Sequence, residues 1–218
     1  MAQVLVLRPE PGASATVARA RSMGLDAVSR PLFEVQPVAW EAPERTAFDG
    51  LLLTSANAVR HGGEQLERLR GLKVYAVGDA TGRAARDAGF DVAATGDAGV
   101  EQLLASIQPD LRLVHLCGAD HRDAGHVRQT IVPIVSYRAE PVDAGRLTEA
   151  DVVLVHSPRA GARLAQVAHD RSSMAVAAIS QAAADAVGGG WQAVEVADAP
   201  TDDALLALAA RLCKKPRP

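Results

Sequence analysis

Apolar residues in this chain gather in short runs that do not alternate with polar residues. Runs of this length, rich in β-branched side chains, predict strands that are buried on both faces of a parallel sheet. The predicted strands are 4–7, 50–54, 74–77, 92–94, 113–116, 131–135, 152–155, 176–179 and 193–196.

Between these runs, apolar residues recur at the spacing of one face of an α-helix. Gly24, Gly89 and Gly190 stand where such helices should end. Strands that alternate with helices form parallel sheets flanked by helices, so the predicted fold class is α/β. The three clearest helical faces are Val59, Gly62, Leu66 and Leu69; Ala160, Leu164, Val167 and Ala168; and Leu205, Leu208, Ala209 and Leu212.

The two halves of the chain repeat one pattern. DGLLLTSANAVR at 49–60 aligns with DVVLVHSPRAGA at 151–162, an offset of 102 residues. At the same offset, VYAVGDATGRAA (74–85) aligns with AVAAISQAAADA (176–187). A constant offset over several elements indicates two versions of one structural unit, that is, an internal pseudo-repeat. The alternative is a chance similarity between two α/β segments.

Two short proline-containing segments, 35–39 and 139–144, are predicted to be linkers. If they run side by side, residues 40–138 form one α/β domain. Residues 1–34 and 145–218 then come together as a second, discontinuous α/β domain.

Composition narrows the classes of function. The net charge of −3 leaves no basic surplus to neutralise phosphates, so no nucleic-acid partner is expected. The two cysteines are far apart and form no CxxC motif, which suits a reducing compartment and predicts no metal site. No apolar run approaches the length of a membrane span, and the first residues do not resemble a secretory signal. We therefore expect a cytoplasmic protein with no membrane partner.

Four predicted strands end in small or hydroxyl-bearing residues directly before a predicted helix. In an open parallel sheet, ligands bind beyond the carboxyl ends of the strands. The N–H groups at a helix N-terminus attract a carboxylate or phosphate, and serine or threonine adds a hydroxyl. These segments therefore predict receptors for an anionic ligand, with ordinary helix capping as the alternative. They are Thr54–Ser55, Gly78–Thr81, His156–Ser157 and Ser180–Ala183.

Other motifs carry less information. The sequence contains no GxGxxG, GxxxxGK[ST] or GxSxG, so nucleotide-cofactor and hydrolase functions lack support. His115, His121 and His126 are interpreted as part of a solvated loop. Arg8, after the first strand, is either an anion clamp or part of a surface loop. Tyr137 either packs at the domain junction or presents its hydroxyl to a binding site.

Nine segments of the chain, taken together and in their order along the sequence, resemble the uroporphyrinogen-III synthase family. They cover nearly the whole sequence. The segments are VLVLRPEPG, GLDAVSRPLFEVQP, DGLLLTSANAV, VYAVGDATGRAARDAGF, HLCGADHR, VSYRAEPV, VVLVHSPRAGARL, AAISQAAADAV and DAPTDDALLAL.

This resemblance implies two flavodoxin-like parallel-sheet domains, joined by a two-stranded linker, with a cleft between them. It implies an enzyme that cyclises hydroxymethylbilane, a linear tetrapyrrole with eight carboxylates, to uroporphyrinogen III. The reaction releases water and inverts ring D. The resemblance implies no cofactor, and we expect a monomer. The alternative is a non-catalytic ligand-binding or regulatory module of the same fold.

The resemblance also assigns roles to residues. Tyr137 matches the tyrosine that acts as a weak acid towards the departing hydroxyl. Family members often carry Gly-Pro-Thr or a second hydroxyl where this chain has Ser180-Gln181-Ala182-Ala183, and the segment from Arg122 to Tyr137 is shorter than usual. The residues expected to bind substrate are Arg8, Ser55, Ala56, Gly78, Asp79, Thr81, Gly118, Ser157, Pro158, Ser180, Gln181 and Ala182.

Overall fold

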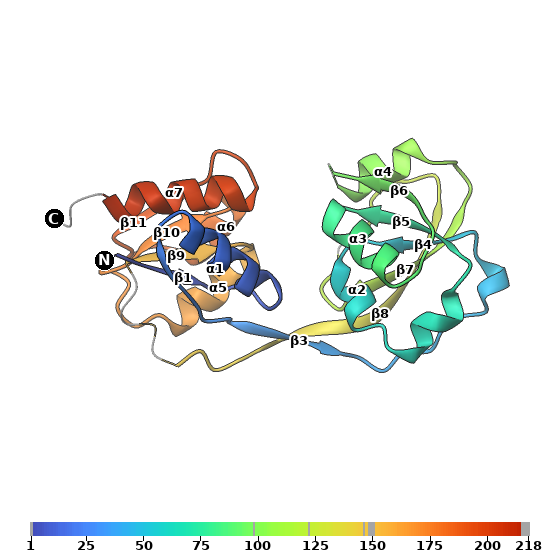
Figure 1. The fold of residues 1–218 in the computed structure, drawn as a ribbon, viewed down its shortest axis with the longest axis horizontal. Coiled ribbons are helices and arrows are strands. Elements are labelled where there is room, and N and C mark those ends of the chain that lie inside the picture. The colour runs from blue at the N-terminus through green and yellow to red at the C-terminus, as the bar shows by residue number, and fades with distance from the viewer. Residues whose placement is uncertain (1, 98, 122, 146, 148–150, 215–218) are drawn as a thin grey trace. The chain divides into compact units, whose positions relative to one another are not determined.

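The computed structural model describes residues 2–97, 99–121, 123–145, 147 and 151–214. The chain forms two compact units (Figure 1). Unit 1 comprises Met1–Glu34 and Glu140–Pro218, and unit 2 comprises Val35–Ala139. Parallel sheets flanked by helices in both units confirm the predicted α/β class. Among the described helices, none is long and apolar enough to cross a membrane.

Unit 1 contains a five-stranded parallel sheet in the order β11-β10-β9-β1-β2. A core of valine, leucine and alanine joins α1 and α7 to the sheet, while α5 packs against α6. The strands are β1 (Gln3–Val6), β2 (Asp26–Ser29), β9 (Val152–Val155), β10 (Ala175–Ala178) and β11 (Ala193–Val196). The helices are α1 (Gly12–Ser22), α5 (Pro158–Val167), α6 (Gln181–Val187) and α7 (Asp202–Lys214).

Unit 2 is built around the strand order β3-β8-β7-β4-β5-β6, in which β8 to β6 are parallel. Two apolar clusters lie on the opposite faces of this sheet. The strands are β3 (Phe33–Pro37), β4 (Gly50–Leu53), β5 (Lys73–Val77), β6 (Val92–Gly96), β7 (Arg112–Gly118) and β8 (Thr130–Pro141). The helices are α2 (Ala56–Arg60), α3 (Asp79–Asp87) and α4 (Val100–Ser106), with 3₁₀ turns at Arg45–Ala47 and Glu64–Leu69.

The helical face predicted from Val59 to Leu69 is wrong as a single helix. Helix α2 ends at Arg60, and a separate 3₁₀ turn begins at Glu64. Between them, Gly63 has a φ of 61° and a ψ of −160°, a conformation that glycine adopts easily and that an α-helix cannot contain. Val59 therefore belongs to α2, whereas Leu66 and Leu69 belong to the separate 3₁₀ turn.

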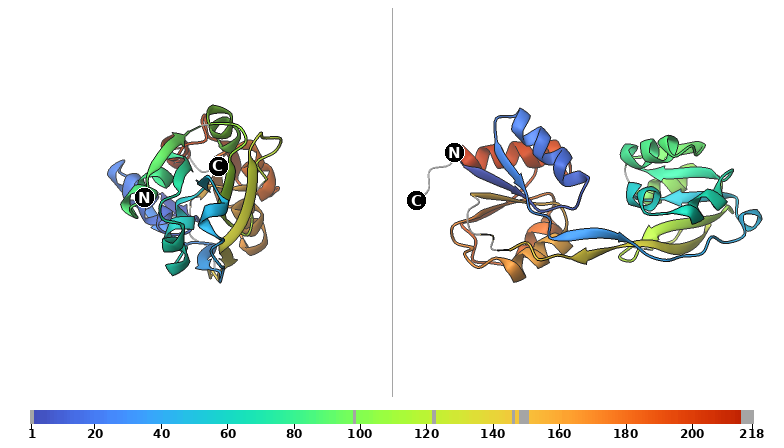
Figure 2. Two further views of the ribbon diagram at one scale, coloured as in Figure 1. Left: turned by 90° about the vertical axis from the view of Figure 1, so that its right-hand side faces the viewer. Right: turned by 60° about the horizontal axis from the view of Figure 1, so that its bottom comes forward.

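The segments predicted as linkers, 35–39 and 139–144, contribute to β3 and β8 (Figure 2). The Val38 N–H donates to the Ser136 carbonyl, and the Val142 N–H donates to the Leu32 carbonyl. The paired residue numbers rise on one strand as they fall on the other, so the two segments run antiparallel.

The two units share one strand order with a different starting point in the chain. Read from β2, unit 1 runs β2-β1-β9-β10-β11, and read from β8, unit 2 runs β8-β7-β4-β5-β6. The repeat offset pairs β4 and β5 with β9 and β10, and with one deletion it pairs β6 with β11. Strands β7 and β8 then match β1 and β2, so unit 2 is a circular permutation of unit 1. The order 2-1-3-4-5 of unit 1 is the flavodoxin-like arrangement.

Candidate functional site

In each unit the strand order reverses next to a central strand, between β1 and β9 in unit 1 and between β7 and β4 in unit 2. Ligands in open α/β sheets bind beyond the carboxyl ends of the strands at such a switch point. Arg8 and Ser157 follow β1 and β9, while Ser55 follows β4 and Gly118 ends β7. The fold therefore places these four predicted residues at the two switch points.

Ser55, Gly118 and Tyr137 meet at the switch point of unit 2. Ser55 caps α2, because its hydroxyl oxygen accepts a hydrogen bond from the Asn57 N–H at 3.2 Å. Tyr137 pairs with Gly118 where a bulge interrupts the register of β7 and β8. A Cβ atom at Gly118 would lie 2.6 Å from Cε2 of Tyr137 and 3.0 Å from its hydroxyl oxygen. The ring occupies this place only because residue 118 has no side chain. Ala56, the first residue of α2, is buried.

Several neighbouring groups affect the pKa of the Tyr137 phenol. Burial raises the pKa of Tyr137, while hydrogen bonding with the Ser55 side chain and the Gly118 backbone lowers it in part. The phenol therefore keeps its proton at neutral pH, as a hydrogen-bond donor must. The ring of His61 lies 6.3 Å from that of Tyr137, between centroids. Burial, and then the charge of Arg60, lower the pKa of His61, so this imidazole is neutral as well.

The second predicted receptor of unit 2 lies at the start of α3. Gly78 has a φ of 80°, and its N–H donates to the Gly96 carbonyl at 2.8 Å. No atom lies within 4 Å of the position that a Cβ of Gly78 would take, so its backbone is open to a ligand. Asp79 is exposed, whereas Thr81 is only 5% exposed. Thr81 lies in the first turn of α3, where its side chain is buried, and its role in substrate binding stays a prediction.

The matching helices of unit 1 begin at capping serines. The Ser157 oxygen accepts from the Ala160 N–H at 3.2 Å, with Pro158 as the first residue of α5. The Ser180 oxygen accepts from the Ala183 N–H at 3.3 Å. These bonds are those of ordinary caps, and each serine keeps its own proton for a further acceptor. In α6, the Gln181 amide donates to Asp185 at 2.7 Å, and Ala182 is exposed.

Arg8 has partners inside unit 1. Its guanidinium lies 3.5 Å from the Asp202 carboxylate and 3.4 Å from the Thr16 hydroxyl. A Cβ atom at Gly12 would lie 2.6 Å from Nε of Arg8, so glycine leaves the space that the side chain crosses. Arg8 is therefore bonded inside unit 1 and is not simply part of a surface loop. The Asp202 carboxylate already offsets its charge.

A polar cluster around Asp202 was not predicted from the sequence. The side chain of His156 is 8% exposed, and its Nε2 lies 2.9 Å from Asp202. The buried Thr16 hydroxyl and Arg19 donate to the same carboxylate. Burial raises the pKa of Asp202, but bonds from His156 and Thr16, with the charges of His156 and Arg8, outweigh it and lower the pKa. His156 takes the place of Thr54 in the repeat, which is the one sequence signal that marks it.

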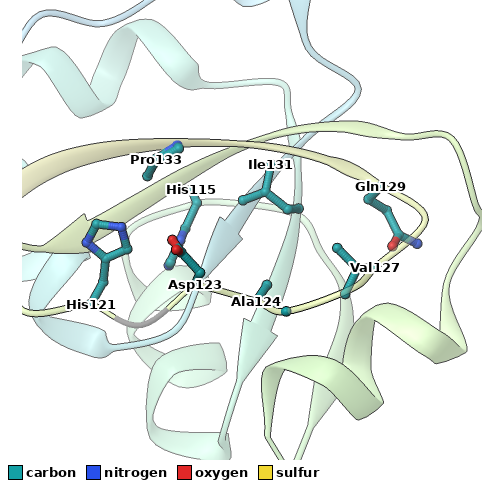
Figure 3. A pocket seen from close by; sticks show the side chains of 9 residues that line it. His115, His121, Asp123, Ala124, Val127, Gln129, Ile131 and Pro133 are labelled. Carbon is teal, nitrogen blue, oxygen red and sulfur yellow. The ribbon is translucent and has the colours of Figure 1, made fainter.

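Unit 2 also contains a pocket of about 250 Å³ that the sequence did not predict (Figure 3). It lies between β7, the loop that follows β7, and β8. The prediction that the clustered histidines form a solvated loop is wrong for His115, which is on β7 and only 4% exposed. Burial, and then the nearby His121, lower the pKa of His115 to about 4. Its Nε2 is hydrogen-bonded to the Thr54 hydroxyl at 3.0 Å. The lining residues are His115, His121, Asp123, Ala124, Gly125, Val127, Gln129, Ile131 and Pro133.

The pocket and Tyr137 belong to opposite faces of the sheet. Ile131 and Val127 pack with the cluster of Leu52 and Leu113, whereas Tyr137 packs with the cluster on the other face. Within the described part of the chain, no three histidine, cysteine or carboxylate side chains are placed to hold a metal ion. Because the histidine-lined pocket and Tyr137 are on opposite faces of the sheet, we treat the pocket as separate from the site at Tyr137.

Taken together, these features define a two-unit α/β protein whose strand ends and helix N-termini suit an anionic ligand. A sequence model of the family described as "Uroporphyrinogen-III synthase HemD" matches residues 14–207. The chain belongs to the uroporphyrinogen-III synthase family.

Individual relatives agree with this assignment. A uroporphyrinogen-III synthase of Chlorobaculum parvum (strain DSM 263 / NCIMB 8327) is 36% identical over 92 residues, which are 38% of this chain and 37% of that protein. The match thus spans little more than a third of the curated relative.

Solved structures show the same fold. Uroporphyrinogen-III synthetase from Helicobacter pylori 26695 superposes with a TM-score of 0.65 at 17% identity, over 97% of this chain and 100% of that one. A mutant uroporphyrinogen III synthase from the extremely thermophilic bacterium Thermus thermophilus gives a TM-score of 0.56 at 19% identity, over 99% and 100% of the two chains.

Proposed function

We propose that this protein is a uroporphyrinogen-III synthase, which cyclises hydroxymethylbilane to uroporphyrinogen III with loss of one water molecule and inversion of ring D. Family membership supports this proposal. The single structural observation that carries it is the position of Tyr137. Its protonated phenol lies at the switch point of unit 2, between Ser55 and Gly118.

The proposed substrate has eight carboxylates, whereas the protein has a net charge of −3. Binding therefore depends on local donors and not on a general positive field. The N-termini of α3 and α5 supply N–H groups and partial positive charge, and Ser157 adds a hydroxyl. Arg8 lies at the end of β1 and, because Asp202 offsets its charge, adds hydrogen-bond donors and not a net positive charge. We propose that these groups bind acetate and propionate side chains of the bilane.

The proposed chemistry needs little acid–base machinery. Hydroxide is a poor leaving group, so a hydrogen bond from the Tyr137 phenol to the departing hydroxyl helps it leave as water. The pyrrole nitrogen supplies the electrons that expel it. Loss of the hydroxyl leaves a cation on the bilane. The remaining task of the protein is to hold the bilane so that this cation bonds to the substituted carbon of ring D, which is a matter of positioning.

The test is an assay with hydroxymethylbilane generated in situ, followed by oxidation and chromatographic separation of porphyrin isomers I and III. Bilane that is not held cyclises without inversion to isomer I. We expect isomer III to predominate when the protein is present. Isomer I alone, at the rate of the protein-free control, would rule out the enzyme.

The second candidate is a non-catalytic ligand-binding or regulatory module of the same fold. The observation that favours it is Ala182-Ala183 at the start of α6, where a second hydroxyl is absent and Ala183 is buried. A protein that binds the bilane in a calorimetric titration, but leaves the isomer ratio unchanged, would support this candidate over the enzyme.

We also propose that the protein acts as a monomer in the cytoplasm. Met23 and Val194 are the exposed large hydrophobic residues among those that the structure describes, and isolated residues of this kind do not make an interface. Light scattering after size-exclusion chromatography should give the mass of a single chain.

A further inference from the structure

An acidic side chain lies beside one of the groups to which the proposed function assigns carboxylate binding. The Asp202 carboxylate, at the start of α7, is 3.5 Å from the guanidinium of Arg8. On its own, an acidic residue in this place would repel a bilane that carries eight carboxylates. Its hydrogen bonds indicate what it contributes instead.

Both oxygens of Asp202 accept hydrogen bonds from side chains of unit 1. The buried Thr16 hydroxyl lies 3.1 Å from Oδ1 and 3.0 Å from Oδ2, and Nη1 of Arg19 lies 3.2 Å from Oδ2. Nε2 of His156 lies 2.9 Å from Oδ1. Burial raises the pKa of Asp202, but the bonds from His156 and Thr16 outweigh burial, so the carboxylate is ionised at neutral pH. This anion thus joins α1, the end of β9 and the start of α7.

The contacts of Arg8 leave one edge of its guanidinium for another ligand. The Thr16 hydroxyl gives its single proton to Asp202, so its oxygen accepts from Nη1 of Arg8 at 3.4 Å. Within the described part of the chain, the side-chain hydrogen bond and the ion pair of Arg8 both use Nη1. The other edge, Nε and Nη2, can hold a carboxylate through two parallel hydrogen bonds. The Arg8 side chain is 37% exposed, so a ligand can reach it.

Gly12 leaves the room that this orientation of Arg8 needs. A Cβ atom at residue 12 would lie 2.6 Å from Nε and 3.0 Å from Nη2 of Arg8. Any other residue at this position would crowd the same two nitrogens. The guanidinium is therefore fixed by Asp202 and Thr16 at Nη1, while glycine keeps the space beside Nε and Nη2 clear.

His156 connects the same carboxylate to the start of α5. An ionised carboxylate only accepts, so Nε2 of His156 carries the proton of this bond. Nδ1 is buried and has no hydrogen-bond partner among the described residues, so the bond to Asp202 orients the ring. The next residue is Ser157, which caps α5. Asp202 thus also helps to hold the strand end that carries Ser157.

We infer that Asp202 is a positioning residue, which directs the Nε–Nη2 edge of Arg8 to a substrate carboxylate and does not bind the substrate itself. This inference rests on the proposed function and names a residue that neither the repeat nor the family resemblance singled out. Charge alone and positioning predict opposite effects when the carboxylate is neutralised, so an experiment can separate them.

Asp202→Asn removes the charge and keeps the size of the side chain. If Asp202 acted only through its charge, the variant would leave Arg8 a net cation and lower KM for hydroxymethylbilane. If Asp202 positions Arg8, KM should rise about three- to tenfold with little change in kcat, as for the loss of one partly exposed charged hydrogen bond. Initial rates of isomer III formation at several bilane concentrations measure both quantities. An unchanged or lowered KM overturns the inference.

Asp203→Asn is the matched control. Asp203 is the next residue of α7, is exposed, and forms its ion pair with Arg19. The variant removes the same charge from the same helical turn, so it should leave KM unchanged or lower it slightly. A rise equal to that of Asp202→Asn would mean that KM responds to the start of α7 in general, and the inference fails.

A double variant tests whether Asp202 acts through Arg8. Arg8→Gln alone should raise KM. Adding Asp202→Asn to Arg8→Gln should raise KM little further, because the side chain that Asp202 positions is already absent. Two effects that multiply would mean that Asp202 serves only the packing of unit 1, and would overturn the inference.

Arg8→Lys gives a measurement that does not depend on the folding of an Asp202 variant. Lysine keeps the charge but lacks the planar edge with two parallel donors. We expect KM to rise nearly as much as in Arg8→Gln, whereas a wild-type KM would show that only charge matters at residue 8 and would overturn the inference. An active wild type whose KM does not respond to Asp202→Asn overturns the inference alone. A wild type that forms no isomer III overturns the proposed function, and the role of Asp202 with it.

Discussion

At Tyr137, burial and hydrogen bonding act on one phenol in opposite directions. Burial raises its pKa, whereas Ser55 and Gly118 lower it, and burial has the larger effect. The result is a phenol that is protonated at neutral pH. Such a group suits hydrogen-bond donation to a leaving hydroxyl, not the role of a base.

Tyr137→Phe tests this role. The variant removes the hydroxyl and keeps the ring against Gly118, so packing should be retained. We expect the rate of isomer III formation to fall by about 10²-fold or less, at the low end of general acid catalysis, because water can replace the phenol as a donor. The product should remain isomer III, since the groups that hold the bilane are intact. Isomer analysis and initial rates measure both quantities, and a variant with full rate would reduce Tyr137 to packing.

A second residue-scale consequence concerns His115. Its folded-state pKa of about 4 lies below the ordinary value of 6.5. Between these two values the unfolded chain binds more protons than the folded chain, so stability falls as the pH falls through this window. The full loss is about 3 kcal/mol, from the size of the shift. Denaturant unfolding at several pH values should show this loss, and His115→Gln should reduce it. The exposed His126→Gln is the control and should retain the wild-type pH dependence.

At the scale of elements, apolar runs predicted the strands well because buried parallel strands have little freedom in composition. All nine predicted runs coincide with strands, whereas β2 (DAVS) and β3 (FEVQP) have no such run: β2 was missed, and β3 was expected only as part of a linker. The break at Gly63 was missed because residue spacing does not report a positive φ. The cluster of His156 and Asp202 could not be predicted, since 46 residues separate them and only the packing of α7 brings them together. Of the site, the strand-end positions could be read from the repeat, but not the contact between Ser55 and Tyr137.

The start of α3 allows a prediction with a close internal control. Gly78 and Gly24 both have a φ of 80°, and for both the Cβ position is free of atoms within 4 Å. Gly78→Ala and Gly24→Ala should therefore each cost about 1–2 kcal/mol of stability through backbone strain. Gly78 lies at the carboxyl end of β5, whereas Gly24 precedes β2. Only Gly78→Ala should raise KM for the bilane and increase the fraction of isomer I. Equal kinetic effects of the two variants would remove Gly78 from the binding groups.

At the scale of the whole molecule, the two units differ in how the sequence builds them: unit 2 is one continuous segment, whereas unit 1 is made of two. Unit 2 is a continuous segment that contains all the strands of its parallel sheet and has its own apolar clusters. Unit 1 is divided, because β1 pairs with β9 through Val4–Val152 and its neighbours, across almost 150 positions of sequence. The circular permutation thus leaves one unit complete within a single stretch of chain, and the other dependent on both ends.

This difference predicts how fragments should behave. A fragment of Val35–Ala139 should fold alone, with cooperative unfolding by circular dichroism and dispersed amide resonances. A fragment of residues 1–34 should be unfolded, since β1 and β2 lack β9 and α7. The larger fragment retains Ser55, Gly118 and Tyr137 but none of the carboxylate-binding groups proposed for unit 1. Supplied with hydroxymethylbilane, it should therefore yield isomer I at the protein-free rate, while the full chain yields isomer III. Isomer III from the fragment would mean that unit 2 alone holds the bilane, and that Arg8 and Ser157 have no part in binding.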